Sequence, residues 1–305
     1  MTLGVLVSFH EFGHFLAARM CGVRVLRFAI GFGKPLFTYR AKNQTEWVLA
    51  AIPLGGYVKL LDGRDPEQVI TAQNKAEAFD EKKLWQRSWI VAAGPLANFL
   101  LSIILFAVIY VSGVPQLPAV LDSPPESSLA AKLGLVQGDR VVGWQDLTDE
   151  QEHIQDDRFE SIPSWNALRW ELLNSVIAQQ GFALELRTAS GARITKIFSA
   201  ADLPMLTPES DPMQALGIKP IVSSSSTWQE LQLGPLDALA YASHRVWLIT
   251  KVSVRLMAGI VTGKTSIKQL GGPLSIADMA GKSAQVGWQP YLAFLALMSI
   301  SIGLL

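Results

Sequence analysis

Residues 89–113 read WIVAAGPLANFLLSIILFAVIYVSG and contain no charged side chain. An α-helix rises 1.5 Å per residue, so this stretch is long enough to cross the roughly 30 Å hydrocarbon core of a bilayer. Its polar atoms are few and belong chiefly to Asn98 and Ser102. An uncharged apolar run of this length is typical of a transmembrane helix. The sequence therefore predicts a membrane protein.

The composition of the whole chain agrees with membrane integration. Half of the 305 residues are hydrophobic and 17% are charged, against about 25% charged residues in soluble domains. Lys and Arg number 26 and Asp and Glu number 26, so the net charge indicates no nucleic-acid partner. One cysteine, Cys21, excludes an internal disulfide framework. We expect no removable signal peptide.

Two further apolar blocks lie near the ends of the chain. Residues 1–23 are apolar except for His10, Glu11, His14 and Arg19, and we predict that they form the first transmembrane helix. Residues 291–305 are predicted to form a third transmembrane helix that is truncated at the chain end.

The loop between the first two predicted helices, residues 24–88, contains a strand-like segment. Residues 46–61 read EWVLAAIPLGGYVKLL, and the pair Gly55-Gly56 is typical of a hairpin turn. Irregular apolar backbone is tolerated at membrane depth only where it lines a cavity or is buried in protein. We therefore predict a membrane re-entrant β-hairpin, with a short cytoplasmic hairpin as the alternative.

After the second helix, residues 114–222 are predicted to form a soluble domain. Turn dipeptides divide this stretch, which contains an amphipathic helix at 165–177 and a hairpin at 183–198 that turns at Ser190-Gly191. The region that follows is predicted to consist of a linker at 223–236, an amphipathic membrane-surface helix at 237–262 whose charges are spaced along it, and a loop at 263–290.

The distribution of basic residues orients these segments. Residues 24–88 contain 11 Lys and Arg, whereas the much longer stretch 113–236 contains 8, together with 16 Asp and Glu. Loops rich in Lys and Arg stay in the cytoplasm. The first loop is therefore predicted to be cytoplasmic and the soluble domain extracytoplasmic.

The first apolar block carries the residues of a metal site. Residues four apart on a helix share a face, so His10 and His14 can bind one ion, and Glu11 lies beside them. Zinc takes three protein ligands and an open position, and Glu11 can then accept a proton from a zinc-bound water. The alternative is two hydrogen-bonded histidines on a polar helix face. In an apolar span such groups cost several kcal/mol, so the metal interpretation is favoured.

At this point the chain resembles the site-2 protease family of intramembrane zinc metalloproteases, in particular its bacterial regulator-of-sigma-E protease branch. The motifs that carry the resemblance occur in the family's order. They are V-S-F-H-E-F-G-H-F-L-A-A-R at 7–19, G-F-G-K-P at 31–35, P-L-G-G-Y-V-K at 53–59, A-G-P-L-A-N-F at 93–99, G-L-V-Q-G-D-R-V at 134–141 and G-G-P-L-S-I-A at 271–277.

The resemblance implies an α-helical polytopic membrane protein with a membrane re-entrant β-hairpin and an inserted α+β PDZ-like domain. It implies that His10 and His14 bind Zn²⁺ and that Glu11 is the general base. Gly94 and Asn98 match the family's G-x-x-x-N motif near the substrate, although Asn98 could instead form an interhelical hydrogen bond. Substrate-binding residues are also implied in the hairpin, at Gly55, Gly56 and Tyr57.

The implied function is regulated intramembrane proteolysis in the bacterial inner membrane, as part of a stress response. The substrate would be a pre-trimmed, single-span membrane protein such as an anti-sigma factor, and the PDZ-like domain would act as a size filter. Relatives in this branch carry two PDZ domains where this chain has one such region, so the fine gating of substrate access is open.

The family's third zinc ligand is an aspartate in an N-x-x-P-x-P-x-L-D-G motif, which we expect beyond Leu305. Leu61-Asp62-Gly63 has the same three letters, but no membrane helix carries it, so Asp62 is predicted to be a turn residue. Two other functions stay open. One is a catalytically incomplete scaffold that binds C-termini through its PDZ-like domain. The other is a soluble-type zinc protease on a membrane anchor, for which His153 is the candidate distal ligand.

Overall fold

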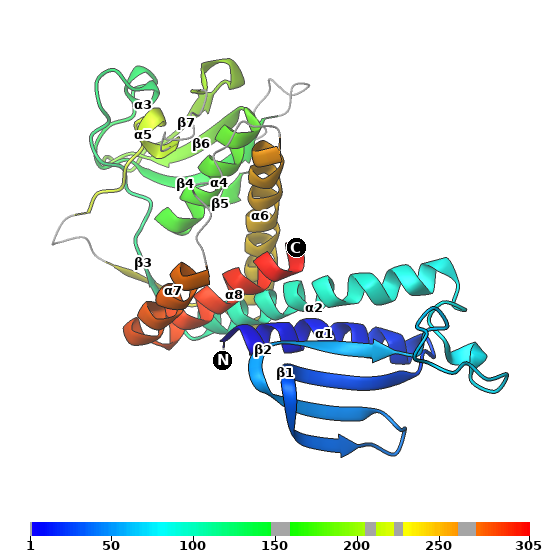
Figure 1. Ribbon diagram of the computed structural model, residues 1–305. Helices are drawn as coiled ribbons and strands as arrows, with labels where there is room; N and C mark the ends of the chain where they lie inside the picture. The colour runs from blue at the N-terminus through cyan, green and yellow to red at the C-terminus, as the bar shows by residue number, and fades with distance from the viewer. Residues whose placement is uncertain (1, 148–158, 205–211, 223–227, 262–272) are drawn as a thin grey trace. The chain divides into compact units, whose positions relative to one another are not determined.

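The computed structural model describes residues 2–147, 159–204, 212–222, 228–261 and 273–305. The chain divides into two compact units, which we describe separately (Figure 1). The helix–hairpin unit comprises Met1–Ile109 and Pro273–Leu305, and the α+β unit comprises Tyr110–Gly272. His153 and the first part of the predicted loop 263–290 lie outside the described residues.

The helix–hairpin unit contains α1 (Thr2–Met20), β1 (Val25–Arg40), β2 (Glu46–Leu60), the short 3₁₀ helix η1 (Lys75–Glu77), α2 (Leu84–Val111), α7 (Pro273–Val286) and α8 (Trp288–Leu304). Small side chains let its helices approach closely. A Cβ atom on Gly13 of α1 would lie 2.3 Å from the carbonyl oxygen of Ala93 on α2, so only glycine fits this crossing.

The contact between α2 and α8 is also made by small polar residues. The Ser299 hydroxyl donates to the carbonyl oxygen of Asn98 at 2.9 Å, and the Ser102 hydroxyl contacts the carbonyl oxygen of Ala296 at 3.0 Å. All four residues are buried. Hydrogen bonds between apolar helices are a common means of fixing their register in a membrane protein.

The hairpin differs from its sequence prediction. Its turn lies at residues 41–45, whereas Gly55 and Gly56 are inside β2, so the predicted turn at Gly55-Gly56 is wrong. Both strands bend and fold back. Residues 27–30 of β1 pair with 46–49 on one side and with 56–59 on the other, and 37–40 pair again with 46–49. A glycine pair is typical of a turn, and Gly55 does leave the ordinary strand conformation, with φ +135°.

Residues 263–290 were predicted as a loop, but α7 occupies Pro273–Val286. Proline at the first helical position begins a helix without losing a hydrogen bond, and the residues that follow are mostly helix-compatible. The sequence favours a loop here because this stretch is flanked by glycines and has fewer apolar residues than the neighbouring spans.

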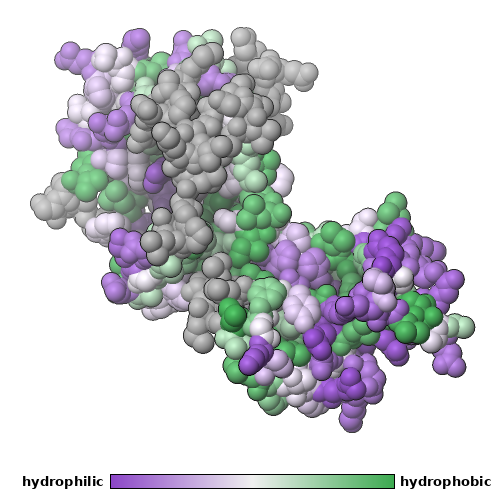
Figure 2. Space-filling model, viewed as in Figure 1, coloured by the Kyte–Doolittle hydropathy of each residue, from purple (hydrophilic) through white to green (hydrophobic). Residues whose placement is uncertain are grey.

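By length and composition, α2 is the one helix among the described residues that could cross a bilayer, and α8 is apolar but shorter. The spans predicted at 1–23 and 291–305 therefore stay predictions. Figure 2 shows hydrophobic surface along the helices of this unit and hydrophilic surface at the end that carries the loop between β2 and α2.

The α+β unit is built around an antiparallel sheet with the order β5-β4-β6-β7. Its elements are β3 (Val114–Gln116), α3 (Leu129–Lys132), β4 (Arg140–Asp146), β5 (Glu160–Ser161), α4 (Trp165–Ala178), β6 (Phe182–Arg187), β7 (Arg193–Phe198), the 3₁₀ helix η3 (Ala200–Asp202), α5 (Pro212–Leu216), β8 (Gln229–Leu231) and α6 (Pro235–Val261). The predicted helix at 165–177 and the hairpin at 183–198 are both confirmed.

A hydrophobic core holds this unit together. Trp144, Phe182 and Phe198 stack in its centre, with ring centroids 4.4 and 4.6 Å apart. Apolar residues of α4 pack beside them. Burial of such aromatic side chains is a large part of the stability of a small domain.

Helix α6 packs against α4 (Figure 1). The charged residues that favoured a membrane-surface helix have partners inside the unit. Arg255 donates to the carbonyl oxygen of Asn174 at 3.1 Å, and Arg245 donates to the side-chain oxygen of Asn166 at 3.2 Å. The membrane-surface placement of this helix stays a prediction.

Candidate metal centre

The predicted metal ligands lie on one face of α1. The ring centroids of His10 and His14 are 4.8 Å apart, and both side chains are half-buried. A Cβ atom placed on Gly94 of α2 would come within 2.3 Å of the Nε2 atom of His14 and 2.7 Å of the Nε2 atom of His10. Both imidazoles therefore direct Nε2 into a hollow that exists because residue 94 has no side chain.

The second nitrogen of His14 determines its tautomer. His14 Nδ1 lies 2.7 Å from the carbonyl oxygen of Ile90. A carbonyl only accepts hydrogen bonds, so Nδ1 carries the proton and Nε2 keeps its lone pair. A hydrogen bond of this kind on the far nitrogen is the usual companion of a metal-binding histidine.

His10 has a similar partner in Asn98. Its Nδ1 atom lies 3.2 Å from the side-chain amide of Asn98, which is fully buried and whose Oδ1 has no hydrogen-bond partner among the described residues. The oxygen and nitrogen of an amide exchange by a half-turn. With the oxygen toward His10, Asn98 accepts from Nδ1–H and the Nε2 lone pair is free.

Glu11 lies on the side of the site that faces the hairpin. A Cβ atom on Gly56 would lie 3.5 Å from Glu11 Cγ, and the Glu11 carboxylate accepts a hydrogen bond from the backbone of Val58. The carboxylate is thus held between β2 and the face of α1 that carries His10 and His14.

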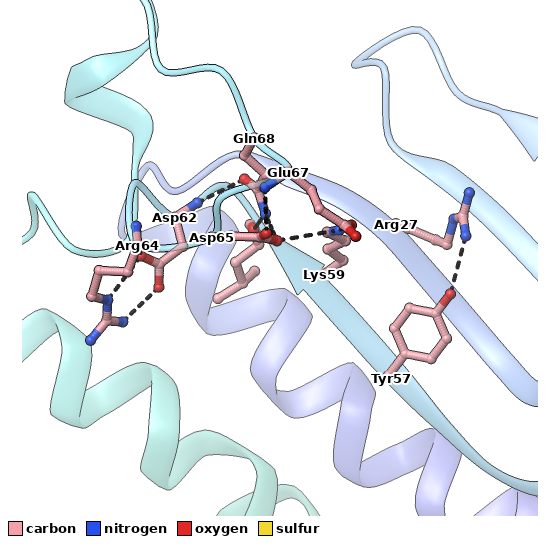
Figure 3. Close-up of polar contacts among 9 residues, drawn as sticks. Arg27, Tyr57, Lys59, Asp62, Arg64, Asp65, Glu67 and Gln68 are labelled. Carbon is pink, nitrogen blue, oxygen red and sulfur yellow. Dashed lines mark hydrogen bonds and ion pairs between the residues drawn. The ribbon is translucent and has the colours of Figure 1, made fainter.

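The remaining predicted residues are placed differently. Gly94, Asn98 and Gly56 meet the histidines or Glu11, as described above. Gly55 packs instead on the ring of Phe32, 2.6 Å from where its Cβ would be. The Tyr57 hydroxyl accepts a hydrogen bond from Arg27 at 3.2 Å (Figure 3).

Asp62 lies in a turn, as predicted. Its carboxylate accepts hydrogen bonds from the backbone and the guanidinium of Arg64, at 2.9 and 2.6 Å (Figure 3). The Arg64 guanidinium holds the pKa of Asp62 below its ordinary value. Both carboxylate oxygens therefore have partners within the turn, which leaves Asp62 no role beside the histidines.

Two contributors to the site escaped the sequence analysis, namely the carbonyl of Ile90 and the backbone N–H of Val58. Both act through the main chain, which every residue possesses, so no side-chain pattern could have indicated them.

The donor set fits zinc. Two imidazoles, each with a partner for its far nitrogen, point into one hollow beside a carboxylate, and imidazole nitrogen is a preferred zinc ligand. Further ligands are needed to complete a zinc site, and the third protein ligand predicted beyond Leu305 stays a prediction.

Comparison with known proteins identifies the family. The model of peptidase family M50 matches residues 1–305. The chain is 30% identical to a Ralstonia nicotianae protein whose name describes it as a zinc metalloprotease. It is 29% identical to the regulator of sigma E protease of Haemophilus influenzae and 30% identical to the regulator of sigma-E protease RseP of Escherichia coli. Each alignment covers 100% of this chain and 85% of the relative.

These alignments extend over more positions than this chain has residues, 399 against 305 for the Ralstonia protein, so the relatives contain additional segments. The motif residues, the paired imidazoles and the full-length match lead to the same conclusion. The chain belongs to peptidase family M50, the membrane-bound site-2 proteases, whose metal is zinc.

Proposed function

We propose that this protein is an intramembrane zinc endopeptidase that cleaves a single-span membrane protein of the anti-sigma-factor class. The observation that carries the proposal is the convergence of the His10 and His14 Nε2 atoms on the hollow at Gly94, with Glu11 beside it. Relatives of similar sequence are named as regulators of sigma E, which supports the class of substrate.

The histidines and Glu11 have different roles in the proposed reaction. Zinc, when bound by His10 and His14, supplies a Lewis acid that makes water nucleophilic near neutral pH and polarises the scissile carbonyl. Glu11 takes the proton from the attacking water and then delivers it to the leaving amine. Its hydrogen bond to the backbone of Val58 orients the carboxylate for this transfer.

The hairpin gives a substrate a place to bind in extended form. Among the described residues, the segment 56–60 pairs with β1 on one side only, so it is an edge of the folded-back sheet. It lies beside α1, next to Glu11. An extended peptide can add to such an edge through main-chain hydrogen bonds. A transmembrane helix must unwind before its peptide bonds are accessible, and pairing with this edge would stabilise the unwound state.

Membrane embedding is supported by the surface of the helices. Apolar side chains spaced by four residues are exposed along α2, and a similar set is exposed along α1. Exposed apolar rows of this kind suit contact with lipid. On the strand that follows the bend, Leu36 and Phe37 are also exposed, in keeping with a hairpin that enters the membrane.

We assign the α+β unit the role of a PDZ-like domain on the outer side of a bacterial inner membrane. An antiparallel sheet packed against α4 around one core supports this assignment. There it would admit substrates whose extracytoplasmic part has already been trimmed.

The test uses the purified protein, completed by any residues that follow Leu305, in lipid vesicles with a single-span reporter. We expect Glu11→Gln to lower cleavage by roughly a hundredfold to ten-thousandfold, the range for loss of a general base, while the zinc content stays at the wild-type level. Glu67→Gln, which alters an exposed carboxylate, is the matched control and should cleave normally. Full activity of Glu11→Gln would refute the proposal.

The scaffold alternative predicts a different result. A scaffold would bind the reporter but leave it intact, and its binding would be insensitive to a chelator. Cleavage by the wild type that chelation abolishes would exclude it. The full-length match to a peptidase family favours the enzyme.

A further inference from the structure

A second group of metal-binding side chains lies entirely within the α+β unit. Glu160 of β5, Glu171 of α4 and His244 of α6 each offer one ligand atom, and these atoms lie within 4.8 Å of one another. The Nε2 atom of His244 is 3.3 Å from Glu160 Oε2 and 3.8 Å from Glu171 Oε1. Ligands of a tetrahedral zinc ion, at about 2.0–2.1 Å from the metal, are roughly 3.4 Å apart. Small side-chain movements would therefore bring the three atoms to ligating positions.

The Glu171 carboxyl is unusually placed for an acidic group. Its side chain is 8% exposed, and the Nε2 atom of His244 lies 3.8 Å from Oε1, which is too far for a hydrogen bond. Burial, followed by the nearby charges of Asp146 and Glu160, raises its pKa to about 8, and Lys251 offsets this only in part. A divalent cation bound here would stabilise the ionised carboxylate.

A buried amide oxygen provides an independent indication of a ligand. Gln145 of β4 is 6% exposed, and its Oε1 atom has no hydrogen-bond partner among the described residues. It lines a cavity of about 330 Å³ together with Glu160, Glu171 and His244. A buried acceptor without a donor costs free energy, and an ion with its water molecules would satisfy it.

The same three side chains also line a neighbouring cavity of about 370 Å³. The three side chains therefore line both cavities, which together have room for an ion and for the water molecules that complete its coordination.

We propose that Glu160, Glu171 and His244 form a second divalent-metal site, with Gln145 bordering it, and that the ion is Zn²⁺. One imidazole with two carboxylates is a donor set for zinc and similar transition metals, whereas Mg²⁺ and Ca²⁺ prefer oxygen ligands alone. The ion would join α6 to α4 and β5. Its role is then to fix α6 against the sheet, independently of peptide cleavage.

The test uses the full chain in detergent, with His10→Ala and His14→Ala introduced so that the first pair of histidines no longer binds zinc. After equilibration with Zn²⁺ and removal of the excess, native mass spectrometry counts the bound ions. We expect one zinc per chain and an increase in the melting temperature on adding Zn²⁺. Mg²⁺ should bind at least tenfold more weakly.

Adding His244→Ala or Glu171→Gln to this background should weaken zinc binding at least tenfold and abolish the thermal shift. Glu126→Gln changes an exposed carboxylate outside the cluster and is the matched control. If the buried Glu171→Gln variant fails to fold, His244→Ala decides, because that side chain is 45% exposed. Absence of zinc from the background chain, or unchanged zinc binding in His244→Ala, would overturn the proposal.

Discussion

The side-chain amide of Asn98 on α2 lies 3.2 Å from the Nδ1 atom of His10 on α1. Together with the contact between His14 and the carbonyl of Ile90, it holds both imidazoles with Nε2 toward Gly94. We therefore expect Asn98 to act as a positioning residue for His10, the proposed zinc ligand. The substrate contact that the sequence predicts for it stays a prediction.

Replacing Asn98 by Leu should weaken zinc binding by roughly 10–100-fold, the usual effect of losing the partner of a metal-binding histidine. Asn98→Asp retains an acceptor oxygen and should bind zinc more tightly than Asn98→Leu. Competition with a chromogenic chelator measures both affinities. Ser102→Ala removes a buried hydroxyl from the same helix without touching His10, and it should bind zinc normally. Equal zinc affinity in Asn98→Leu and the wild type would contradict this role.

The sequence was sufficient to predict the histidine pair because the two residues are four apart on one helix, and the geometry of a helix alone brings them together. The groups on α2 that position the two imidazoles could not be predicted from the geometry of a single helix. Gly94 was identified through a family motif, and its physical role as a missing side chain opposite two Nε2 atoms depends on how closely α1 and α2 cross. That crossing is made by Gly13 against Ala93, a contact between residues distant in sequence.

The path of the hairpin is a second feature that the sequence alone does not predict. The apolar segment 46–61 correctly predicts strand structure, but its sequence could not show that each strand bends and pairs twice. A glycine pair has the same appearance in a tight turn and in a bent strand, because both need a backbone that other residues avoid. Only the pairing of β1 with two parts of β2 distinguishes the two structures.

Lipid contact by α2 makes a prediction for Ile104, which is 47% exposed and belongs to an apolar row with Leu96, Leu100 and Val108. Arginine near the middle of a span costs about 2.5–3.5 kcal/mol in insertion. Ile104→Arg should therefore reduce the membrane-integrated fraction, measured by resistance to alkaline extraction. Val69→Arg, at an 80% exposed position of the loop before α2, is the control. If both variants integrate equally well, Ile104 does not face lipid.

The raised pKa of Glu171 makes the stability of the α+β unit depend on pH when no metal is bound. The folded state keeps the Glu171 proton up to about pH 8, whereas the unfolded chain releases it near the ordinary value of 4.5. The stabilisation by this proton is complete below about pH 4.5 and is lost as the pH rises through about 8.

Glutamine imitates the protonated acid, so Glu171→Gln should escape this loss. We expect the free energy of unfolding of Glu171→Gln to rise relative to that of the wild type between pH 5 and pH 8, by up to about 1.4 kcal/mol per pH unit. Thermal unfolding in the presence of a chelator measures this difference. For Glu126→Gln, at an exposed position, the difference in free energy of unfolding from the wild type should stay the same between pH 5 and pH 8. A pH-independent difference for Glu171→Gln would mean that the carboxyl is already ionised at pH 5.

The central claim is that zinc occupies the hollow at Gly94 between the two Nε2 atoms, and the zinc content of Gly94→Ala tests it most directly. The new Cβ would lie 2.3 and 2.7 Å from those atoms, so we predict that zinc is lost although alanine is the better helix former. Gly281→Ala is the matched control, because nothing lies within 4 Å of its Cβ position. Elemental analysis of the purified proteins should find zinc in the wild type and in Gly281→Ala but not in Gly94→Ala. Wild-type zinc content in Gly94→Ala would contradict the account.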